Sequence, residues 1–403
     1  MKKITMRMLC LCLAAVLCFG LVACGEKNAD PTNGTVGTTQ GTEATTEATT
    51  PTTEPVEVVE NYDVILSDNV IKNIIIIIGD GMGPKHVTAG MFYDAMTYEF
   101  TNWSTVKVNT YPLLDASGAL DTSPTDSAAS ATAMATGVLT PNGRLGKDIN
   151  NQELPTIMDL ASSLGKATGI VTTDVLSGAT PGAFSAHASY RDNVNEIIPS
   201  QKASGVNLLC GFANDKYTLI SHEFVEAGYA YADTVAGAKA TYSAEKAIWQ
   251  LDTYGVDATL PLQDVTPLAL EYLNQDPDGF VLMLEQAHPD KYSHGNEFEN
   301  VVKSVSDLNK TVEVVMEWVG DRTDTLVIVA ADHECGGLMV TEKTGKYTDS
   351  YVVGDKTLYY EFTSTNHTGS YIDMYVYGVE ADFTQSALYS RKQLKNTGVY
   401  KLM

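Results

Sequence analysis

The stretch Ile71-Lys-Asn-Ile-Ile-Ile-Ile-Ile-Gly-Asp-Gly-Met-Gly83 decides the fold class of this chain. Its apolar run is continuous, which is typical of a strand that is buried on both faces of a parallel sheet. The glycines on both sides of Asp80 let the backbone approach a ligand or an ion closely. Asp80 is therefore a candidate metal ligand, and a capping aspartate in a tight turn between a strand and a helix explains it equally well on its own.

Two further apolar runs lead directly into acidic residues. Gly279-Phe-Val-Leu-Met-Leu284 runs into Glu285, and Thr325-Leu-Val-Ile-Val-Ala-Ala331 runs into Asp332 and His333. Open α/β sheets place their active sites at the edge where parallel strands end. The pattern predicts an α/β fold with a largely parallel central sheet, helices on both of its faces, and a metal site at the C-terminal edge of the strands.

The side chains at these strand ends are carboxylates and imidazoles. Asp290 and His294 lie four residues apart, so a helical turn would place them on one face. Asp332 and His333 are adjacent, and they diverge unless the backbone leaves strand geometry there. Carboxylates and imidazoles without a cysteine cluster suit catalytic zinc, and oxygen donors alone suit a harder ion. A single pair of aspartate and histidine is better explained as part of a solvated loop, or as a buried histidine that has its hydrogen bonds. The predicted metal site therefore depends on several pairs together.

The segment from Asp121 to Gly137 holds a candidate nucleophile. Its turn residues give way after Asp126 to small residues that favour a helix, and a glycine ends the run. Ser127 would therefore lie at or near a helix N-terminus, where N–H groups favour an anion. A neighbouring metal could hold its hydroxyl as an alkoxide and make it a phosphoryl acceptor. The alternative is that Asp126 or Ser127 is a plain N-cap.

Three later residues could join this site. Another expected strand, Gly169-Ile-Val-Thr-Thr-Asp174, leads to Thr180, which offers a hydroxyl ligand. Arg191 has the planar fork that matches a tetrahedral oxyanion, although a surface arginine is the default explanation. The stretch Asn366-His367-Thr-Gly369 supplies one of only 7 histidines in the chain.

The N-terminal residues predict that the protein is exported. Residues 1–23 carry basic residues and then an apolar stretch too short for a spanning helix, so we expect a signal peptide. Leu21-Val-Ala-Cys24 resembles a bacterial lipoprotein signal, in which the cysteine is acylated; the alternative is a soluble secreted protein that is cut nearby. Residues 24–60 are then a lipidated N-terminus and a threonine-rich disordered linker. The catalytic domain is expected at residues 61–403, outside the cytoplasm and anchored by lipid to the bacterial cell membrane.

Composition narrows the choice of partners. With 403 residues, 44% of them hydrophobic and 19% charged, the chain can bury a sizeable core without a disulfide scaffold. Of its 6 cysteines, only Cys210 and Cys335 lie in the folded body, so at most one bridge can form there. A formal net charge of -24 argues against nucleic acid as a partner. An anionic substrate would need local positive charge, which bound divalent cations supply.

Six motifs give the chain a resemblance to a known family. G-D-G-M-G, T-D-S-A-A-S-A-T-A, A-T-P-x-A, E-x-x-x-x-D-x-x-x-H, A-D-H-E-x-G-G and H-T-G occur in this order across residues 73 to 369. In these motifs the chain resembles the alkaline phosphatase family. The resemblance implies an alkaline-phosphatase-like fold and hydrolysis of phosphate monoesters through a phosphorylated Ser127, with an alkaline pH optimum.

The same resemblance implies three metal ions. Their ligands are carboxylates, imidazoles and one hydroxyl, in three sets: Asp290, His294 and His367 for one zinc; Asp80, Asp332 and His333 for a second zinc; and Asp80, Thr180 and Glu285 for magnesium. The second zinc would also hold the Ser127 oxygen, and Arg191 would grip the phosphate. The all-oxygen third set suits a harder ion.

The chain departs from the best-known members of that family near the magnesium ligands. Gly178 stands where others carry an acidic residue or a histidine, and Lys291 stands where members vary. These differences bear on magnesium binding and on rate. His288 and Lys291 are expected behind the ligands in supporting roles; the alternative for His288 is a further metal ligand or a contact through water to phosphate. Cys335 is expected to be a bystander beside the metal motif.

Between His333 and His367 the chain makes only a short excursion, where the family often inserts a crown region at its dimer interface. A small crown-type insertion is therefore expected, and formation of a homodimer is left open. The stretch from Asp192 to Asp278 carries no recognised motif. We assign it to the surroundings of the substrate and to outer helices, with one helix expected at Ser243 to Leu251.

Two other classes of function remain. One is a phosphodiesterase, phosphonate hydrolase, sulfatase or metal-dependent phosphomutase built on the same sheet; the complete T-D-S-A-A-S block together with Arg191 and Glu285 favours monoesters. The other is a tethered lipoprotein that binds phosphate or metal without turnover, which the intact nucleophile disfavours. Small phosphate monoesters are the expected substrates, and phosphate scavenging at the cell exterior is the expected task.

Overall fold

The computed structural model of the chain describes residues 70–113, 121–379, 389–390 and 393–403. The signal peptide predicted at residues 1–23, the acylation predicted at Cys24 and the linker predicted at residues 24–60 lie outside these described residues. Within them, no helix is both long enough and apolar enough to cross a membrane.

The described residues form a central sheet of 11 strands, with β1 (Asn73–Gly79) in its interior. β1 pairs in parallel with β7 (Phe280–Gln286) on one side and with β8 (Thr325–Ala330) on the other. Beyond β7 the parallel order continues through β3 (Ala167–Thr172), β4 (Leu208–Phe212), β6 (Lys246–Leu251) and β5 (Tyr229–Ala232). Beyond β8 lie an antiparallel β14 (Ile372–Tyr377), then β2 (Ser104–Asn109), β16 (Gln393–Lys395) and β15 (Tyr389–Ser390). The sheet is largely parallel, as predicted.

The register of the three central strands brings their carboxyl ends to one edge. Ile78 of β1 lies opposite Glu285 of β7 on one side and opposite Ala330 of β8 on the other. Glu285 in turn lies opposite Thr172 of β3. Because parallel strands end at the same edge, the acidic residues that follow them lie at this edge.

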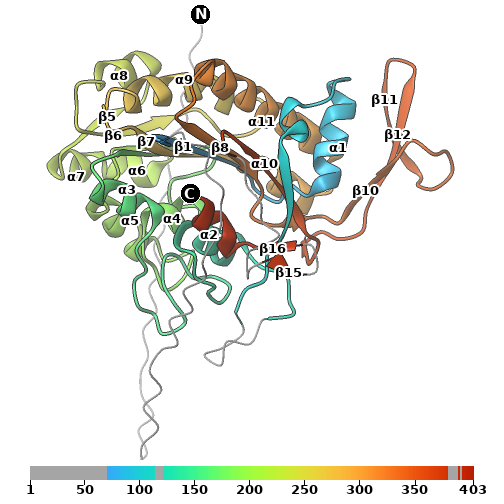
Figure 1. Cartoon of the computed structure of the whole chain (residues 1–403), viewed down its shortest axis with the longest axis horizontal. Helices are drawn as coiled ribbons and strands as arrows, with labels where there is room; N and C mark the ends of the chain where they lie inside the picture. Colours follow the sequence, from blue (N-terminus) through green and yellow to red (C-terminus); the bar gives the residue numbers. More distant parts are fainter. Residues whose placement is uncertain (1–69, 114–120, 380–388, 391–392) are drawn as a thin grey trace, which may run out of the picture. The chain divides into compact units, whose positions relative to one another are not determined.

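Helices cover both faces of the sheet, which gives the α/β layering that the sequence predicts (Figure 1). One face is covered by α9 (Leu262–Leu273) and α11 (Phe298–Val319), and the other by α2 (Ser127–Thr136), α3 (Ile157–Ser163), α4 (Ala179–Ser185) and α12 (Thr397–Leu402). α11 buries Val301, Val305, Leu308, Val312 and Val315, whose spacing of three and four residues marks one face of a helix. The other described helices border these layers: α1 (Pro84–Tyr93), η1 (Glu99–Asn102), α5 (Val194–Ala203), α6 (Asp215–Leu219), α7 (Ser221–Glu226), α8 (Val235–Ala240) and α10 (His288–His294).

The prediction of a helix at Ser243 to Leu251 is wrong, because Lys246–Leu251 is strand β6. β6 lies between β4 and β5, and its residues from Ala247 to Leu251 are buried. A short apolar run that is buried on both faces has no periodicity that separates strand from helix, and aromatic and β-branched residues such as Ile248 and Trp249 favour the strand. The stretch from Asp192 to Asp278 therefore extends the sheet by three strands, besides supplying outer helices.

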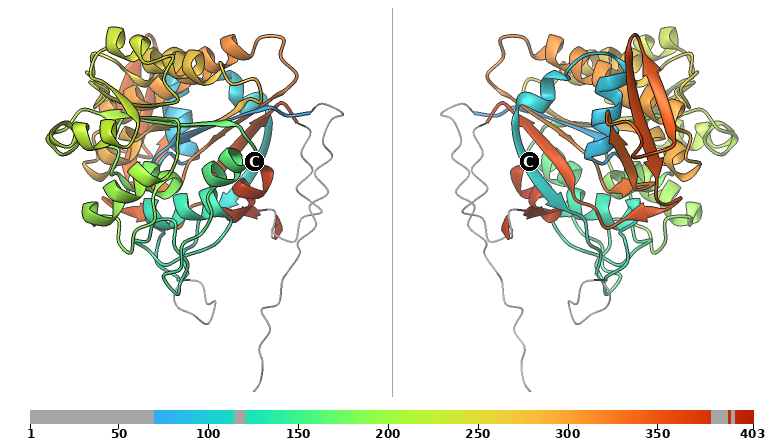
Figure 2. Two further views of the ribbon diagram at one scale, coloured as in Figure 1. Left: turned by 90° about the vertical axis from the view of Figure 1, so that its left-hand side faces the viewer. Right: turned by 90° about the vertical axis from the view of Figure 1, so that its right-hand side faces the viewer.

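The short excursion between His333 and His367 contains a separate antiparallel sheet. Its strands are β10 (Leu338–Thr341), β12 (Lys356–Phe362) and β11 (Asp349–Val353). In Figure 2 these orange-red strands stand beside α1 and α11. The contact is apolar: Leu338 and Leu358 share a small buried cluster with Phe298, whose ring stacks on Tyr360 with 3.9 Å between ring centroids. The excursion is thereby attached to α11.

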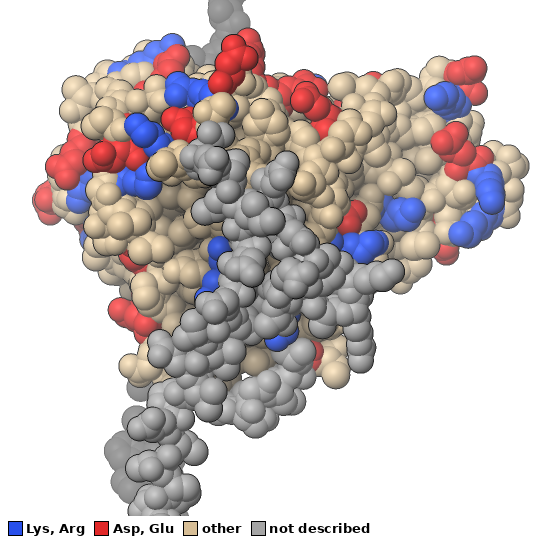
Figure 3. Space-filling view, in the orientation of Figure 1, with Lys and Arg blue, Asp and Glu red and all other residues tan. Residues whose placement is uncertain are grey.

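The surface of the described residues carries charges of both signs. On the face in Figure 3, lysine and arginine side chains are interspersed with aspartate and glutamate side chains. On the described part of that face, the basic side chains do not form a continuous surface.

Candidate active site

The backbone around Asp80 explains why glycines flank it. Gly81 has a φ of 69°, a conformation that L side chains rarely adopt. A Cβ at this position would also lie 2.7 Å from the Cα of Asp290. The glycine therefore lets the turn after β1 approach the start of α10. As a result, Asp80 and Asp290 belong to one site although they come from distant parts of the sequence.

Asp80, Asp332 and His333 form what we call the inner cluster. One ligand atom from each lies within 4.8 Å of the others. His333 Nε2 is 3.4 Å from Asp80 Oδ1 and 3.3 Å from Asp332 Oδ2, and the Gly81 N–H donates to Asp332 Oδ1 at 3.1 Å. Asp332 and His333 are fully buried, and Asp80 is nearly so. Burial and the neighbouring carboxylates, Asp332 first, raise the pKa of Asp80 well above its usual value, and burial lowers that of His333.

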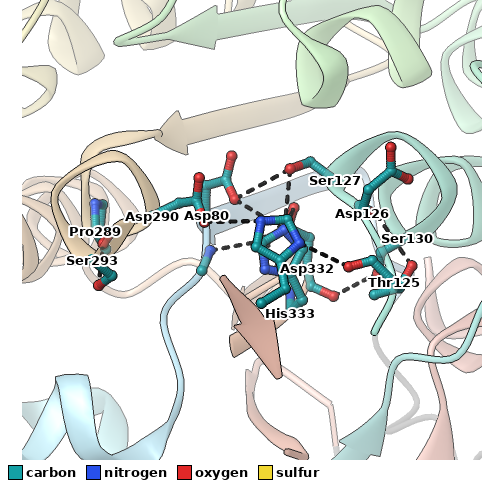
Figure 4. A network of polar contacts seen from close by, with 12 residues as sticks. Asp80, Thr125, Asp126, Ser127, Ser130, Pro289, Asp290, Ser293, Asp332 and His333 are labelled. Carbon is teal, nitrogen blue, oxygen red and sulfur yellow. Dashed lines mark hydrogen bonds and ion pairs between the residues drawn. The ribbon is translucent and has the colours of Figure 1, made fainter. Parts of the chain in front are cut away.

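Ser127 lies beside the inner cluster (Figure 4). It is the first residue of α2, as predicted, and Asp126 is the N-cap, whose carboxylate accepts from the Ala129 N–H at 2.9 Å. Ser127 Oγ is 3.1 Å from His333 Nε2 and 3.5 Å from Asp80 Oδ1. The hydroxyl is therefore aimed at the same atoms that the inner cluster presents to a cation. The helix N-terminus behind it favours negative charge at this point.

Asp290, His294 and His367 form what we call the outer cluster. Asp290 and His294 lie on α10, as their spacing predicts, with His294 Nε2 3.4 Å from Asp290 Oδ2. His367 Nε2 is 3.2 Å from Asp290 Oδ1. The other ring nitrogens bond to backbone carbonyls, that of His294 to Thr365 and that of His367 to Thr125. Burial opposes ionisation of Asp290, but its contacts with His294 and then His367 outweigh burial and hold its pKa well below the usual value.

The structure also places Cys335 at the outer cluster, where the sequence predicts a bystander. Its sulfur lies within 4.8 Å of ligand atoms of Asp290, His294 and His367. β9 (Glu334–Cys335) pairs with β13 (His367–Thr368), and in that register Cys335 lies opposite His367. Burial, followed by the charge of Asp290, raises the pKa of its thiol. Cys335 and Cys210 are both free, so the one bridge that the sequence allows is not formed.

Thr180 and Glu285 lie on α4 and β7. The resemblance to the alkaline phosphatase family assigns both residues to magnesium. Both are almost completely buried. One oxygen of Glu285 accepts a hydrogen bond from the Thr172 hydroxyl, whereas the Thr180 hydroxyl oxygen has no hydrogen-bond partner. Burial first, and the charge of Asp174 second, raise the pKa of Glu285 to about 8.

Two cationic side chains at the site are each held by a carboxylate. Arg191 Nη1 lies 3.1 Å from Oδ2 of Asp126, the residue before Ser127, so the guanidinium is fixed next to the serine. Lys291 Nζ lies 2.9 Å from Asp174 Oδ2. Burial opposes both charges, but in each case the carboxylate partner outweighs it and raises the pKa. Sequence reasoning found both cations and missed both partners.

His288 lies behind the ligands. Its Nδ1 is 3.1 Å from the Thr173 hydroxyl and 3.0 Å from Gln286 Oε1, and its Nε2 accepts from the Gly255 N–H at 2.9 Å. Burial lowers its pKa to about 4, so the ring is neutral at ordinary pH. These contacts tie α10 to the ends of β3 and β7 and give His288 a supporting position.

The buried atoms without hydrogen bonds show whether cations fit here. Among the described residues they include Thr180 Oγ1, Asp290 Oδ1, Asp332 Oδ2 and His333 Nδ1. Histidine nitrogens approach the two aspartate oxygens at 3.2 and 3.3 Å, but without the geometry of a hydrogen bond. A buried polar atom without a partner costs free energy, and cation binding would satisfy these oxygens. The mixed donors fit zinc, and the oxygens of Thr180, Glu285 and Asp80 fit a harder ion.

Comparison with known sequences gives one consistent result. The family model described as alkaline phosphatase matches residues 71–215 and 249–398. The chain is 32% identical over 299 residues to alkaline phosphatase 4 of Bacillus subtilis, covering 67% of this chain and 63% of that protein. It is 30% identical over 359 residues to alkaline phosphatase of Escherichia coli, covering 69% of this chain and 73% of that protein. The chain thus spans a little under two thirds of the length of its Bacillus relative.

Solved structures share the fold. The cold-active alkaline phosphatase of Shewanella sp. superposes with a TM-score of 0.71 at 24% identity, over 82% of this chain and 98% of that one. The alkaline phosphatase of Thermus thermophilus gives a TM-score of 0.69 at 18% identity, over 83% of this chain and 91% of that one. At these identities the structures support the architecture, including the largely parallel sheet between two helical layers.

Proposed function

Because this chain belongs to the alkaline phosphatase family, which is metal-dependent, we propose that it hydrolyses phosphate monoesters with Ser127 as nucleophile. The observation that carries the proposal is the position of Ser127 Oγ, at a helix N-terminus and 3.1 Å from His333 Nε2 of the inner cluster. A buried hydroxyl in that position is aimed into a cluster of cation ligands. A serine that only capped the helix would not need to point at these ligands, and the N-cap residue is Asp126.

The proposed reaction has two steps. In the first, Ser127 Oγ loses its proton and bonds to phosphorus, while the bond from phosphorus to the alcohol oxygen breaks and the alcohol leaves with a proton. In the second, a water oxygen bonds to phosphorus and the bond to Ser127 Oγ breaks. Inorganic phosphate leaves, and the serine hydroxyl is restored.

The chain's own residues orient the phosphate group. Arg191 offers a planar guanidinium next to Ser127, and its contact with Asp126 fixes the direction of the fork. One further N–H pair of the guanidinium can bind two nonreacting phosphate oxygens. The N-terminus of α2 adds favourable partial charge at the serine.

We propose zinc for the outer cluster (Asp290, His294 and His367) and for the inner cluster (Asp80, Asp332 and His333), and magnesium for Asp80, Thr180 and Glu285. Bound there, the cations would supply the positive charge that lowers the pKa of the serine hydroxyl and neutralises the leaving oxygen. The buried ligand oxygens without hydrogen bonds support this proposal.

Hydrolysis of p-nitrophenyl phosphate from pH 6 to 11 tests the function. The chain should turn over this substrate with an alkaline optimum, lose turnover after chelation and regain it with zinc. Ser127→Ala should reduce turnover by at least about a thousandfold while zinc-loaded protein still binds inorganic phosphate. Full activity in Ser127→Ala removes the serine from its role. Turnover of bis(p-nitrophenyl) phosphate or p-nitrophenyl sulfate instead would move the chain to the diesterase or sulfatase classes.

For localisation we propose export and anchoring through an acylated Cys24, with residues 24–60 as a tether. The support is the sequence pattern alone. Metabolic labelling with a palmitate analogue should mark the full chain and should fail to mark Cys24→Ser, which should appear in the culture medium. Labelling of both proteins, or of neither, contradicts the proposal.

A further inference from the structure

The loop between β3 and α4 carries Asp174 and Gly178, and the two share one space. Gly178 has φ -59° and ψ 161°, a conformation open to any residue, so the backbone does not require glycine here. A Cβ at this position would lie 3.0 Å from Asp174 Oδ2 and 3.5 Å from Asp174 Cγ. The carboxylate of Asp174 therefore occupies the place that a side chain at 178 would need.

Asp174 is held rigidly from its backbone. Its N–H donates to the Thr172 hydroxyl at 2.9 Å, and its carbonyl accepts from the Phe212 N–H at 2.8 Å. Thr172 in turn donates to Glu285. The base of the Asp174 side chain is therefore fixed to two neighbouring strands and to the proposed magnesium ligand.

The ion pair between Asp174 and Lys291 is partly buried. The side chains are 17% and 32% exposed, and the nitrogen and oxygen are 2.9 Å apart. Partial burial weakens solvent screening, so this pair is stronger than a typical surface pair. Lys291 directly follows Asp290 on α10. The ion pair thus links the loop after β3 to the helix that carries two outer-cluster ligands.

Without Asp174, the Lys291 ammonium would face other acids. Burial and neighbouring carboxylates raise the pKa values of Asp80 and Glu285, and the charge of Lys291 opposes that rise. Both are proposed ligands of the magnesium ion, so an ammonium released from Asp174 would be drawn towards them and would compete with that ion. The ion pair instead holds Lys291 Nζ 2.9 Å from Asp174, a carboxylate that is not a proposed metal ligand.

We propose that Asp174 is a positioning residue for Lys291: from the end of β3 it supplies a carboxylate that Gly178 cannot, and it holds the ammonium where it contacts the phosphate group. An ammonium carries three N–H donors, of which Asp174 accepts one, so donors remain for a phosphate oxygen. The contact with phosphate rests on the proposed function, whereas the ion pair and its shared space with position 178 do not.

The test moves the carboxylate from one position to the other. Asp174→Ala should weaken binding of inorganic phosphate to the zinc- and magnesium-loaded full chain by about tenfold, measured by calorimetry, because the ammonium loses its position. Adding Gly178→Asp to Asp174→Ala should restore most of that affinity. Adding Gly178→Ala instead should restore none of it. This control brings the same Cβ, 3.0 Å from the Val175 carbonyl, without a carboxylate.

Kinetics on the same four proteins separate positioning from folding. The KM for p-nitrophenyl phosphate and the magnesium concentration for half-activation should rise in Asp174→Ala and fall again only with Gly178→Asp. A merely structural role for Asp174 would lower the amount of folded enzyme without this selective recovery. Unchanged or tighter phosphate binding in Asp174→Ala, or equal recovery with both second substitutions, overturns the proposal.

A double-mutant cycle gives a readout that needs neither metal nor substrate. In urea unfolding of the chelated protein, Asp174→Ala and Lys291→Met should couple by about threefold or more in the unfolding equilibrium constant. In the protein that carries both Asp174→Ala and Gly178→Asp, the coupling should reappear between Lys291 and the carboxylate introduced at position 178. No coupling, in a chain that turns over monoesters, overturns the inference alone. A chain that neither binds phosphate nor turns over monoesters overturns the proposed function and the phosphate contact, while the cycle still reports on the ion pair.

Discussion

The inner and outer clusters hold similar ligands on different supports. The inner ligands Asp80 and Asp332 follow two adjacent central strands, and the paired backbone fixes their positions. The outer ligands come from the seven-residue helix α10 and from the end of the excursion. The histidines differ in exposure in the same way, since the His333 side chain is 0% exposed and the His294 side chain 41%. The sheet therefore preorganises one cluster, while the other depends on two attached segments.

Of the two substitutions that compare the clusters, Asp332→Asn in the inner cluster should lower turnover more than His294→Ala in the outer cluster. The asparagine keeps the shape but removes one of the two inner carboxylates beside Ser127. Loss of charge stabilisation worth several kcal/mol corresponds to a fall in turnover of about a thousandfold or more. The measurement is p-nitrophenyl phosphate hydrolysis during a zinc titration.

Because the ligand is buried and fixed, added zinc should not restore the activity of Asp332→Asn. Asp349→Asn on the exposed part of the excursion is the matched control and should behave as wild type. Recovery of Asp332→Asn at high zinc would mean that the inner cluster is as adaptable as the outer one.

His294→Ala should give a smaller and repairable effect. The ligand is half-exposed and water can take its place, so the zinc concentration for half-activation should rise by about ten- to a hundredfold. The rate at saturating zinc should stay within a few-fold of wild type. Activity measured against buffered free zinc gives both quantities. A thousandfold loss at saturating zinc would mean that the outer cluster tolerates the loss of a ligand no better than the inner cluster.

The same division explains how much could be predicted from sequence. The shared edge of Asp80, Glu285 and Asp332 could be predicted, because continuous apolar runs mark buried parallel strands and strand ends converge at one edge. The common helix of Asp290 and His294 could be predicted, because a spacing of four residues fits a helix. The partners Asp126 for Arg191 and Asp174 for Lys291 were missed, because no local pattern says which distant loop meets a cation.

The error in secondary structure has the same origin. The run before Leu251 was assigned to a helix although it is strand β6, because full burial removes the alternation that distinguishes the two. That Cys335 is a bystander stays a prediction, and its proximity to the outer cluster follows from the pairing of β9 with β13, which is a long-range contact.

Removal of metal should give the smallest effect of the three predictions, seen in stability against pH. The folded pKa of Glu285 is raised to about 8 from 4.5, so its contribution to stability is complete below pH 4.5 and is lost as pH rises to about 8. His86 and His288, with pKa values lowered to about 4, act in the opposite direction, but their contribution is complete above pH 6.5. Between pH 6.5 and 8 the chelated protein should therefore lose stability.

The expected slope is about 1.4 kcal/mol per pH unit for each proton that unfolding releases. Urea unfolding of the chelated protein from pH 6.5 to 8.5 measures it. Glu285→Gln should flatten the curve near pH 8. His294→Ala should flatten it only just above pH 6.5, because contact with Asp290 raises the pKa of that histidine. Metal-loaded protein should show neither slope. Equal slopes in all these proteins would exclude Glu285 as their source.

The hydrogen bond from the Gly81 N–H to Asp332 joins residues that are 251 positions apart in the chain. Contacts of such long range form late in folding, because the loop between them must close first. A ribosome that has made Gly81 must add 251 further residues before Asp332 is present. A chain that ends before β8 therefore cannot assemble the inner cluster. Cation binding at this cluster would wait until β8 is made and paired with β1, so an unfolded chain would lack this preorganised site.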